Sequence, residues 1–201
     1  TRRAKDVPDA RAWVLEHFAA EEPRPLRTAL AQLPRLAAGQ GAILQAVESA
    51  SGKKRLLFHH EARAHNALDL RLFGLLQPGD NSLVALARGG RTLMRYSTEN
   101  FHDKYFRLDP DQPCRTIVSH LHKDANGFIH PEDHRGITAR EAARVQGFPD
   151  DYVFLGSRCD QFIQIGNAVP PPVAACFAKY FDHAREFGRG GPLPARARRR
   201  R

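Results

Sequence analysis

The sequence has few of the residues that build covalent cross-links or membrane spans. Its 201 residues include only three cysteines, Cys114, Cys159 and Cys176, which lie far apart and form no CxxC pair. This usage disfavours a disulfide framework and is typical of a reducing, cytoplasmic setting. No apolar run approaches the roughly 18 residues that a membrane helix needs. The N-terminal stretch TRRAKDVPDA lacks the apolar segment of a secretory signal, so no membrane association is expected.

The excess of positive charge is concentrated at the C-terminus. The chain is 42% hydrophobic and 26% charged, as expected for a globular protein, and its net charge is +9. Residues 189–201 hold six arginines and no acid, so the remainder has 25 basic against 22 acidic residues. We predict that residues 188–201 form a disordered Arg-rich tail. This tail would either bind phosphate backbones without sequence preference or be a solvated end without a task.

The spacing of apolar residues predicts five helices and a few short strands. The predicted helices span residues 9–20, 24–33, 60–76, 138–146 and 173–186. Two strands are predicted at residues 115–120 and 127–130, and residues 80–115 are predicted to form loops with short strands. In the fourth helix, Thr138 and Glu141 fit a capping box, which marks the start of the helix.

A Gly-Asn pair followed by three prolines stands before the last predicted helix, in the stretch QIGNAVPPPVAACFAKYF. Gly166 lets the backbone bend, and Asn167 offers both a donor and an acceptor. The prolines preset φ for the first turn of the helix. The prediction is a rigid ledge at residues 166–172 that suits a small ligand with an amino-acid end. The alternative is a proline-stopped turn that only docks the helix.

Three stretches, in this order, resemble the C-terminal part of a bacterial Dcm-like DNA cytosine-5 methyltransferase. The stretch FHDKYFRLDPDQPCRTIVSHLHKDANGFIHPEDHRGIT resembles the end of that family's target-recognition region. The stretch RGITAREAARVQGFPDDYVF is similar to its ninth motif, and QFIQIGNAVPPPVAACFAKYF to its tenth motif and the helix that follows. Looser segments extend the resemblance to roughly residues 25–187.

The resemblance implies an α+β fold and a division of the chain. We expect a small target-recognition lobe of short strands and helices. C-terminal helices would complete a Rossmann-like methyltransferase domain that is missing from this chain. Residues 1–24 lie outside the resemblance and are assigned to an N-terminal helix from their apolar spacing, whereas residues 25–134 would form linker helices and the target-recognition region. Residues 135–187 would form the ninth- and tenth-motif helices that return to the catalytic domain.

The same resemblance implies a cofactor but no catalytic residue. Asn167, Ala168 and Val169 would form one wall of a pocket for S-adenosylmethionine. The family's Gly-rich cofactor loop, Pro-Cys-Gln loop and Glu-Asn-Val stretch are absent from the sequence. Cys114 follows a proline, but Arg115 stands where glutamine is required. We therefore expect no catalytic residue in this chain and no activity of the chain alone.

The implied function belongs to a larger enzyme. The chain would be the DNA-recognition and cofactor-pocket-closing part of a DNA (cytosine-5-)-methyltransferase, which methylates a flipped cytosine in duplex DNA. Its partners would be double-stranded DNA and a catalytic part that carries the Gly-rich and Pro-Cys-Gln loops. An adjacent nuclease gene would place it in a restriction-modification system. A split-enzyme small subunit and a fragment both fit, and Thr1 in place of a starting Met favours the fragment.

The expected DNA contacts lie mainly between residues 80 and 125, because basic and short polar side chains bind phosphates and base edges. Thr116, which precedes an aliphatic residue as in the family, is the predicted phosphate contact. His120, His122 and Asn126 would reach base edges. The basic candidates are Arg88, Arg91, Arg95, Lys104, Arg107 and Lys123. Each basic candidate has a plain alternative as a solvated surface group.

A second set of polar residues is expected to brace the recognition lobe against the catalytic one. These residues are Arg135, Arg140, Glu141, Arg144 and Gln146. A buried network of arginine and glutamate fixes an angle between two lobes at some cost in desolvation. The alternative is an exposed helix with i,i+4 charges, in which Glu141 serves only as a cap.

Two other functions compete with this interpretation. A metal-dependent nuclease would use His120, His122, His130 and His134 with Asp124 nearby, but no Cys pair or HxxE helix accompanies them. We therefore predict no metal site. A stand-alone DNA-binding module would explain the basic tail and the missing nucleophile. The apolar stripe Val173, Phe177 and Phe181 on the last helix disfavours the module, because that stripe needs a partner surface.

Overall fold

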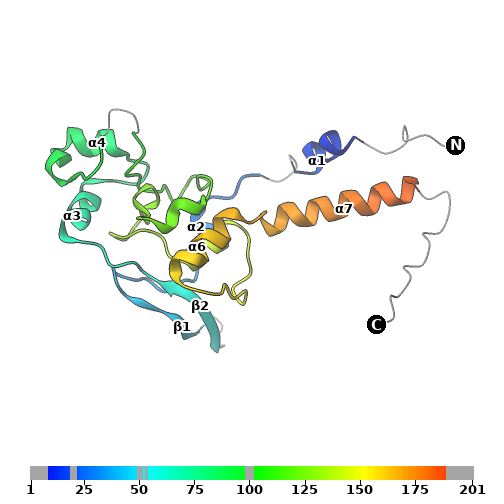
Figure 1. Ribbon diagram of the computed structural model, residues 1–201, viewed down its shortest axis with the longest axis horizontal. Coiled ribbons are helices and arrows are strands. Elements are labelled where there is room, and N and C mark those ends of the chain that lie inside the picture. Colours follow the sequence, from blue (N-terminus) through cyan, green and yellow to red (C-terminus); the bar gives the residue numbers. More distant parts are fainter. Residues whose placement is uncertain (1–8, 19–21, 49–51, 53, 98–101, 189–201) are drawn as a thin grey trace. The chain divides into compact units, whose positions relative to one another are not determined.

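The computed structural model describes residues 9–18, 22–48, 52, 54–97 and 102–188, and Figure 1 shows their helices and strands. The chain divides into two compact units. One contains residues 1–22 and 171–201, and the other contains Pro23–Pro170. The predicted boundary between residues 134 and 135 therefore falls inside the second unit. Residues 189–201 of the predicted tail lie outside the described residues.

An antiparallel hairpin that the sequence analysis missed forms part of the 23–170 unit (Figure 1). Strands β1 (Gly41–Glu48) and β2 (Lys54–Glu61) pair so that Leu44 lies opposite Phe58. Gly41 has φ +94°, and a Cβ there would lie 2.2 Å from the carbonyl oxygen of His60. Only glycine combines this backbone conformation with so close an approach, so Gly41 permits the pairing at this end of the hairpin.

The helix predicted at residues 60–76 is shorter than its apolar spacing indicated. His60 belongs to β2, and α3 (Ala67–Leu75) begins only after Asn66, whose side chain accepts a hydrogen bond from the Asp69 amide at 2.8 Å. This N-cap sets the start of the helix. Two further helices follow where loops were predicted: α4 (Ser82–Ala87) and the 3-10 helix η2 (Gly90–Leu93).

The strands predicted at residues 115–120 and 127–130 are wrong. These segments contain the 3-10 helices η3 (Ser119–His122) and η4 (Asn126–Phe128). Ile129 makes only isolated bridges, to Arg107 and Gly136. Short apolar runs do not distinguish a strand from a buried turn, and here they supply single core residues. Ile117, Leu121 and Phe128 are each no more than 5% exposed.

Helix α5 (Ala139–Val145) begins as predicted, with the capping box of Thr138 and Glu141 present. Helix α2 (Leu26–Leu30) is shorter than the predicted 24–33, because Ala31 already has an extended backbone with ψ 141°. Both helices contribute to the main core. Its buried members include Leu26, Leu108, Ile117, Leu121, Phe128, Ile137, Ala142, Phe154, Phe162 and Ile165.

Helix α6 (Arg158–Asn167) was not predicted, although its start carries a readable signal. Ser157 and Asp160 form a second capping box, with the Ser157 hydroxyl accepting from the Asp160 amide. The helix buries Phe162 and Ile165 in the main core. Gly166 is therefore the penultimate residue of a helix, and the predicted turn at 166–172 is confined to the residues between α6 and the next helix.

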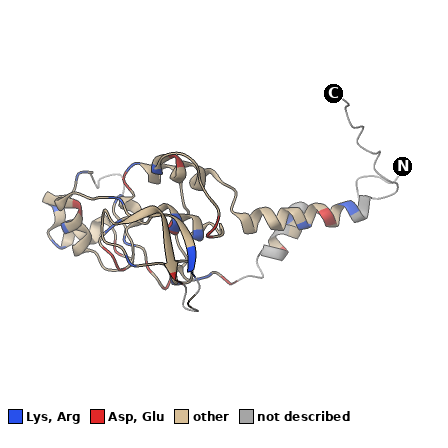
Figure 2. Ribbon diagram, turned by 90° about the horizontal axis from the view of Figure 1, so that it is seen from below, with Lys and Arg blue, Asp and Glu red and all other residues tan. Residues whose placement is uncertain are grey.

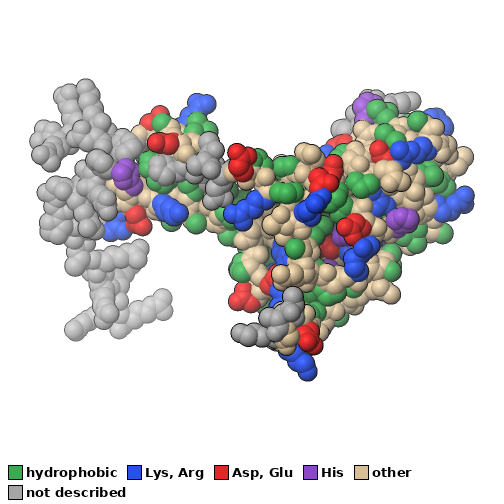
Figure 3. Space-filling model, turned by 180° about the vertical axis from the view of Figure 1, so that it is seen from behind, with side chains coloured by type: hydrophobic (Ala, Val, Ile, Leu, Met, Phe, Trp, Pro, Cys, Tyr) green, Lys and Arg blue, Asp and Glu red, His purple; other side chains and the backbone are tan. Residues whose placement is uncertain are grey.

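The other unit pairs α1 (Ala10–Phe18) with α7 (Pro171–Gly188). The ring centroids of Trp13 and Tyr180 lie 5.6 Å apart, and Tyr180 is only 8% exposed. Phe177 and Phe181 remain 39% and 61% exposed. Figure 3 shows hydrophobic side chains at the surface of this unit as well as on the larger one. Among the described residues, no helix combines the length and apolarity that crossing a membrane requires.

Candidate functional site

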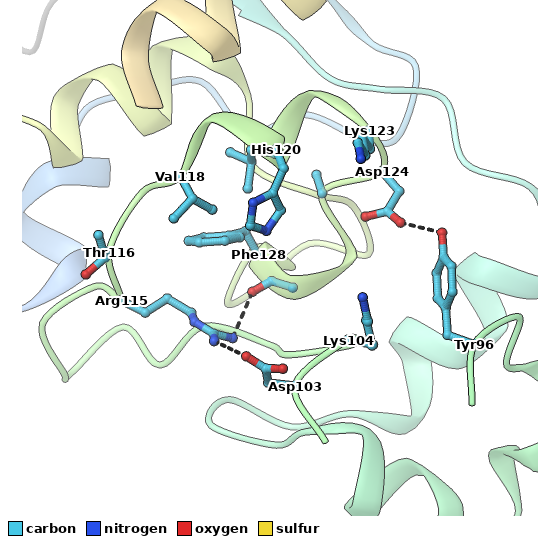
Figure 4. Close-up of a pocket in the computed structure, with 13 residues that line it drawn as sticks. Tyr96, Asp103, Lys104, Arg115, Thr116, Val118, His120, Lys123, Asp124 and Phe128 are labelled. Carbon is cyan, nitrogen blue, oxygen red and sulfur yellow. Dashed lines mark hydrogen bonds and ion pairs between the residues drawn. The ribbon is translucent and has the colours of Figure 1, made fainter. Parts of the chain in front are cut away.

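One cavity of about 910 Å³ in the 23–170 unit gathers basic, acidic and aromatic side chains (Figure 4). Residues before and within η3 form one side of it, and the 103–104 loop another. The lining residues are Tyr96, Asp103, Lys104, Arg115, Thr116, Val118, His120, Leu121, Lys123, Asp124, Ala125, Gly127 and Phe128. Elsewhere in this unit, basic and acidic residues are interspersed along the ribbon (Figure 2), so the cavity is distinguished by its shape and its mixture of groups.

Arg115 is held in place by a carboxylate, a carbonyl and two aromatic rings. Its guanidinium pairs with Asp103 and donates a longer hydrogen bond to the Gly127 carbonyl at 3.4 Å. Its Cζ lies 4.9 Å from the ring centroid of Phe106 and 5.5 Å from that of Phe128, which is cation–π geometry. The hydrogen bond from Arg115 holds the pKa of Asp103 below its usual value. The Asp103 carboxylate is therefore charged at neutral pH, and its contact with Arg115 is preorganised at the cavity wall.

Tyr96 and Asp124 form a second polar pair at the cavity (Figure 4). The Tyr96 hydroxyl donates to Asp124 at 2.6 Å, and this hydrogen bond raises the pKa of Tyr96 to about 12. The Nζ of Lys104 lies 5.7 Å from the Tyr96 ring centroid. The phenol is thus a neutral donor, and its ring is partly exposed, as a surface for base stacking would be.

Four of the predicted DNA contacts line this cavity: Lys104, Thr116, His120 and Lys123. Three of them come from the stretch 116–123 around η3, and all four are exposed. Thr116 is exposed while the next residue, Ile117, is 4% exposed in the core. Ile117 therefore anchors the segment in the core, and Thr116 faces the cavity.

Four other predicted DNA contacts do not line the cavity. Arg88 donates to Asp80 at 2.6 Å, and Arg95 donates to Asp69 at 2.7 Å. The Nδ1 of His122 lies 2.8 Å from the Ser119 carbonyl, to which it donates. Arg91 is exposed on η2. DNA binding by these four residues stays a prediction. To bind DNA, Arg88, Arg95 and His122 would have to give up their present partners within the chain.

Arg107 and Asn126 are placed inside the fold, against the prediction that they contact DNA. Arg107 is 2% exposed and donates to the carbonyls of Phe73 at 2.7 Å, His130 at 2.8 Å and Pro131 at 3.1 Å. Its guanidinium therefore joins α3 to the 130–133 loop. Asn126 is 0% exposed at the start of η4. Composition alone could not separate these residues from the exposed ones, because burial depends on packing.

The residues predicted to brace two lobes form a buried network within this chain, and a role between lobes stays a prediction. Arg135 is 1% exposed and donates to both carboxylate oxygens of Glu141 at 2.8 Å. It also donates to the Leu36 carbonyl at 2.9 Å, across a separation of 99 residues. These hydrogen bonds outweigh the desolvation of Glu141 and lower its pKa to about 2. The pair is thus ionised, bidentate and almost fully buried. Removing only one of the two partners would be destabilising, because the other charge would stay buried without compensation.

The remaining brace residues tie α5 to the rest of the unit. Arg140, 0% exposed, donates to the carbonyls of Phe58 in β2, Pro149 and Tyr152 at 2.6 to 2.9 Å. Arg144 forms two hydrogen bonds to Asp150, each 2.6 Å long, and also donates to the carbonyls of Ala29 and Ala31 at the end of α2. Gln146 donates to the Ile165 carbonyl of α6 at 3.1 Å. The alternative of an exposed helix is excluded for Arg140 and Glu141 by their burial.

The predicted cofactor ledge is at the surface. Asn167 ends α6 and is exposed, Ala168 is the C-cap with an extended backbone, and Val169 is 61% exposed. Gly166 itself serves packing, because a Cβ there would lie 2.3 Å from the Ser119 nitrogen. The explanation of Gly166 as a flexible bend is therefore replaced by a close approach of two backbones.

His130 and Cys114 are packed within the fold. Among the described residues, no group of three or more His, Cys, Asp or Glu side chains could hold a metal ion. The Nδ1 of His130 accepts from the amides of Glu132 and Asp133 at 3.2 and 3.0 Å. Cys114 packs against the main core, and burial raises the pKa of its thiol to about 11. A thiol that stays protonated at neutral pH is a poor nucleophile.

The family model for C-5 cytosine-specific DNA methylases matches residues 50–182, about two thirds of the 201 residues. The chain belongs to this family. The matched segment contains all the residues that line the cavity, the brace in and around α5, and the ledge at Asn167. The metal-dependent nuclease and the stand-alone DNA-binding module are not favoured.

Two named relatives differ greatly in how much of them the chain covers. It is 41% identical over 103 residues to the type II methyltransferase M.AquIB of Picosynechococcus sp., which is 46% of this chain and 70% of that protein. It is 64% identical over 79 residues to the DNA (cytosine-5)-methyltransferase PliMCI of Paracentrotus lividus, which is 38% of this chain and 5% of that protein. The chain spans only 15–24% of the length of three further type II methyltransferases in the family.

A solved structure supports the mixed helix-and-strand fold of the chain. The crystal structure of a DNA modification methyltransferase encoded within an E. coli prophage aligns with a TM-score of 0.57 and 22% identity. The alignment covers 83% of this chain and 49% of that chain. The two chains thus share a mixed fold of short strands and helices over most of this chain.

Several residues at the cavity were not predicted, chiefly Arg115, Tyr96, Asp103 and Asp124. Arg115 precedes Thr116 directly, so its position next to a predicted contact was a signal that could have been used. The pairing of Arg115 with Asp103 and of Tyr96 with Asp124 spans 12 and 28 residues, and no local pattern indicates it.

Proposed function

We propose that this chain is the DNA-recognition and cofactor-pocket-closing part of a DNA (cytosine-5-)-methyltransferase, which transfers a methyl group from S-adenosylmethionine to a flipped cytosine in duplex DNA. The observation that carries the proposal is the cavity in a chain of this family. Lys104, Thr116, His120 and Lys123, each predicted as a DNA contact, converge on one open space. Basic groups there would bind phosphates, and Thr116 would position the strand.

The cavity offers more than a charged surface. Its lining combines the cations Lys104 and Lys123 with the ionised Asp103 and the neutral Tyr96, whose hydroxyl donates to Asp124. A site for phosphates alone needs no carboxylates, whereas base edges present both donors and acceptors. The mixture of cations, acceptors and an aromatic face supports contact with bases beside the flipped cytosine as well as with the backbone.

The ledge at the end of α6 fits one wall of a cofactor pocket. Asn167 is exposed and has an amide that both donates and accepts, while the neighbouring Val169 is 61% exposed and apolar. Together with Ala168 they would hold S-adenosylmethionine, which supplies the methyl group when bound. The remaining walls would come from the catalytic part, which carries the Gly-rich and Pro-Cys-Gln loops. The exposed Phe177 and Phe181 of α7 would pack against that part.

The catalytic part would belong either to a second polypeptide or to a further part of the same polypeptide. The 103 residues aligned with M.AquIB make up 70% of that protein, so M.AquIB is itself a short chain that carries the name of a methyltransferase. In either arrangement the chemistry needs a thiolate, and Cys114, the cysteine that follows a proline, is partly buried with its pKa raised to about 11. We expect a soluble enzyme of a restriction-modification system in a bacterial cytoplasm.

The test is reconstitution. The chain is co-expressed with the catalytic part encoded beside it in its source genome, and transfer of tritiated methyl from S-adenosylmethionine to DNA cytosine is measured. We expect label only when both parts are present. Asn167→Ala should raise the KM for S-adenosylmethionine, and Lys123→Ala the KM for DNA. A folded, associated pair that transfers no label would refute the proposal, as would transfer by this chain alone.

A further inference from the structure

Two segments that serve different ligands in the proposed function touch backbone to backbone. Gly166 of α6 lies against the start of η3, where an added Cβ would be 2.3 Å from the Ser119 nitrogen and 2.4 Å from the Val118 carbonyl carbon. Both neighbours are main-chain atoms, so neither can rotate away as a side chain would. Gly166 is not among the positive-φ glycines. Its lack of a side chain is therefore needed for the close approach and not for its backbone conformation.

The other end of η3 is held by Arg63. Its guanidinium donates to the His122 carbonyl at 2.6 Å and to the Lys123 carbonyl at 2.7 Å. A planar fork spans two neighbouring carbonyls in a way that a single ammonium does not. The segment 118–123 is thus fixed at its start by α6 and at its end by the residues that follow β2.

This segment and α6 hold the two proposed sites. Thr116, His120 and Lys123 line the cavity from the η3 side. Asn167, the first residue of the ledge, follows Gly166 directly. Helix α6 itself is secured by the capping box at Ser157 and by the hydrogen bond from Gln146 to the Ile165 carbonyl. The contact at Gly166 therefore joins the end of a fixed helix to the segment that presents the DNA contacts.

We propose that Gly166 and Arg63 are positioning residues that hold the 116–123 segment in a fixed place relative to the ledge at Asn167. The inference rests on the proposed function. Neither residue lines the cavity. Each acts through η3, so that the DNA contacts and the cofactor wall form one preorganised block instead of two independently moving loops.

The experiment uses the 201-residue chain and a fluorescent duplex of random sequence at low salt. Gly166→Ala and Arg63→Lys are compared with wild type by fluorescence anisotropy, at a temperature where circular dichroism shows every variant folded. Gly74→Ala in α3 is the matched control, because its Cβ would meet only the His134 ring at 3.4 Å. We expect about tenfold weaker binding for both test variants, equivalent to ~1.4 kcal/mol, and no change for the control.

Hydrogen exchange supplies a readout that is independent of DNA. The amides of Leu121 and Lys123 donate to the carbonyls of Val118 and His120 within this segment. We expect faster exchange of these two amides in both test variants and unchanged exchange in Gly74→Ala. Arg63→Lys keeps the charge, so a loss of affinity in that variant reports geometry and not the removal of a cation. If Gly166→Ala does not fold, Arg63→Lys decides the matter.

The outcomes separate the two proposals. Wild-type affinity or unchanged exchange in the test variants, while the wild-type chain binds DNA, overturns the positioning role and leaves the proposed function standing. A wild-type chain that does not bind duplex DNA refutes both. Weakened binding together with faster exchange confined to 118–123 supports the positioning role.

Discussion

Arg135 pairs with two carboxylates and Arg115 with one, and the two arginines lie in different surroundings. Arg135 is 1% exposed, and its donors are directed at Glu141, Asp133 and main-chain carbonyls. The side chain of Arg115 is 33% exposed and lines the open cavity. The buried arginine holds the parts of one unit together, whereas the partly exposed one has a side toward open space where a ligand can approach.

The number of arginines therefore does not indicate a DNA-binding surface. Arg107 stands between residues predicted to contact DNA, yet it is 2% exposed and donates only to carbonyls. Lys104, three residues earlier, is exposed at the cavity. Burial and partner type together distinguish the structural groups from the candidate contacts, and each prediction below tests that distinction.

The largest effect is expected for Arg135→Met. The change leaves the buried carboxylate of Glu141 without its main partner, which should lower the free energy of unfolding by about 3–5 kcal/mol. Chemical denaturation measures it. Arg35→Met is the matched control, because Arg35 also pairs with Asp133 but its side chain is 66% exposed, so its loss should stay below about 1 kcal/mol. Similar losses in the two variants would contradict the burial argument.

Arg107→Met should lower stability by about 2–3 kcal/mol, because buried carbonyls of Phe73 and His130 lose their donor. Its affinity for duplex DNA, measured by anisotropy below the unfolding transition, should equal that of wild type. A folded Arg107→Met variant with weaker DNA binding would restore Arg107 to the DNA contacts and break the division between the two groups.

Acid should destabilise the unit in two separate steps. Burial lowers the pKa values of His65 and His130 to about 4, below the 6.5 of the unfolded chain. The unfolded state therefore binds these protons first, and stability falls as pH drops from 6.5 towards 4. Each unit of difference between the folded and unfolded pKa values contributes at most about 1.4 kcal/mol to this loss of stability. The pKa of Glu141 is about 2, below its ordinary value of 4.5. Its protonation therefore adds a second loss of stability as the pH falls from 4.5 towards 2.

The first step can be assigned with His65→Gln. The Nε2 of His65 accepts from the Gly136 amide at 3.0 Å, and a glutamine oxygen can accept in its place without being protonated. Denaturation midpoints measured from pH 8 to pH 4 should fall less steeply for this variant. A profile parallel to that of wild type would show that His65 does not contribute to the acid loss.

Lys123→Ala should weaken DNA binding by about tenfold and reduce the salt slope by about 1, uniformly across sequences. Stability should change by less than about 0.5 kcal/mol, because the side chain is exposed. Lys54→Ala, which removes an exposed lysine from β2 outside the cavity, is the control. An equal loss of affinity in the control would mean that charge, and not position at the cavity, governs binding.

The smallest effect on stability is expected for Phe181→Ser. Its side chain is 61% exposed, so the free energy of unfolding should change by less than about 0.5 kcal/mol. Association with the catalytic part, measured by analytical ultracentrifugation, should weaken nonetheless. Tyr180→Ser, which removes the ring packed on Trp13, should lower the stability of the α1–α7 pair instead. Unchanged association of Phe181→Ser would contradict the assignment of α7 to that partner.

Features that depend on near neighbours in the chain could be predicted from the sequence. The capping box of Thr138 and Glu141 follows from side chains three residues apart in the chain. The order of the three resembling stretches also sufficed for the family, because residues 50–182 match it. Such features depend on local bonding, which one stretch of chain contains in full.

The burial of polar residues depends on tertiary contacts, and so does the requirement for glycine at position 166. Arg140 reaches Phe58 across 82 residues, and Arg144 reaches Ala29 across 115. Gly166 is constrained by Val118 and Ser119, far from it in the chain. Whether a guanidinium meets carbonyls, a carboxylate or open space depends on which distant segments pack around it. That packing minimises exposed apolar area over the whole unit, and no local pattern records it.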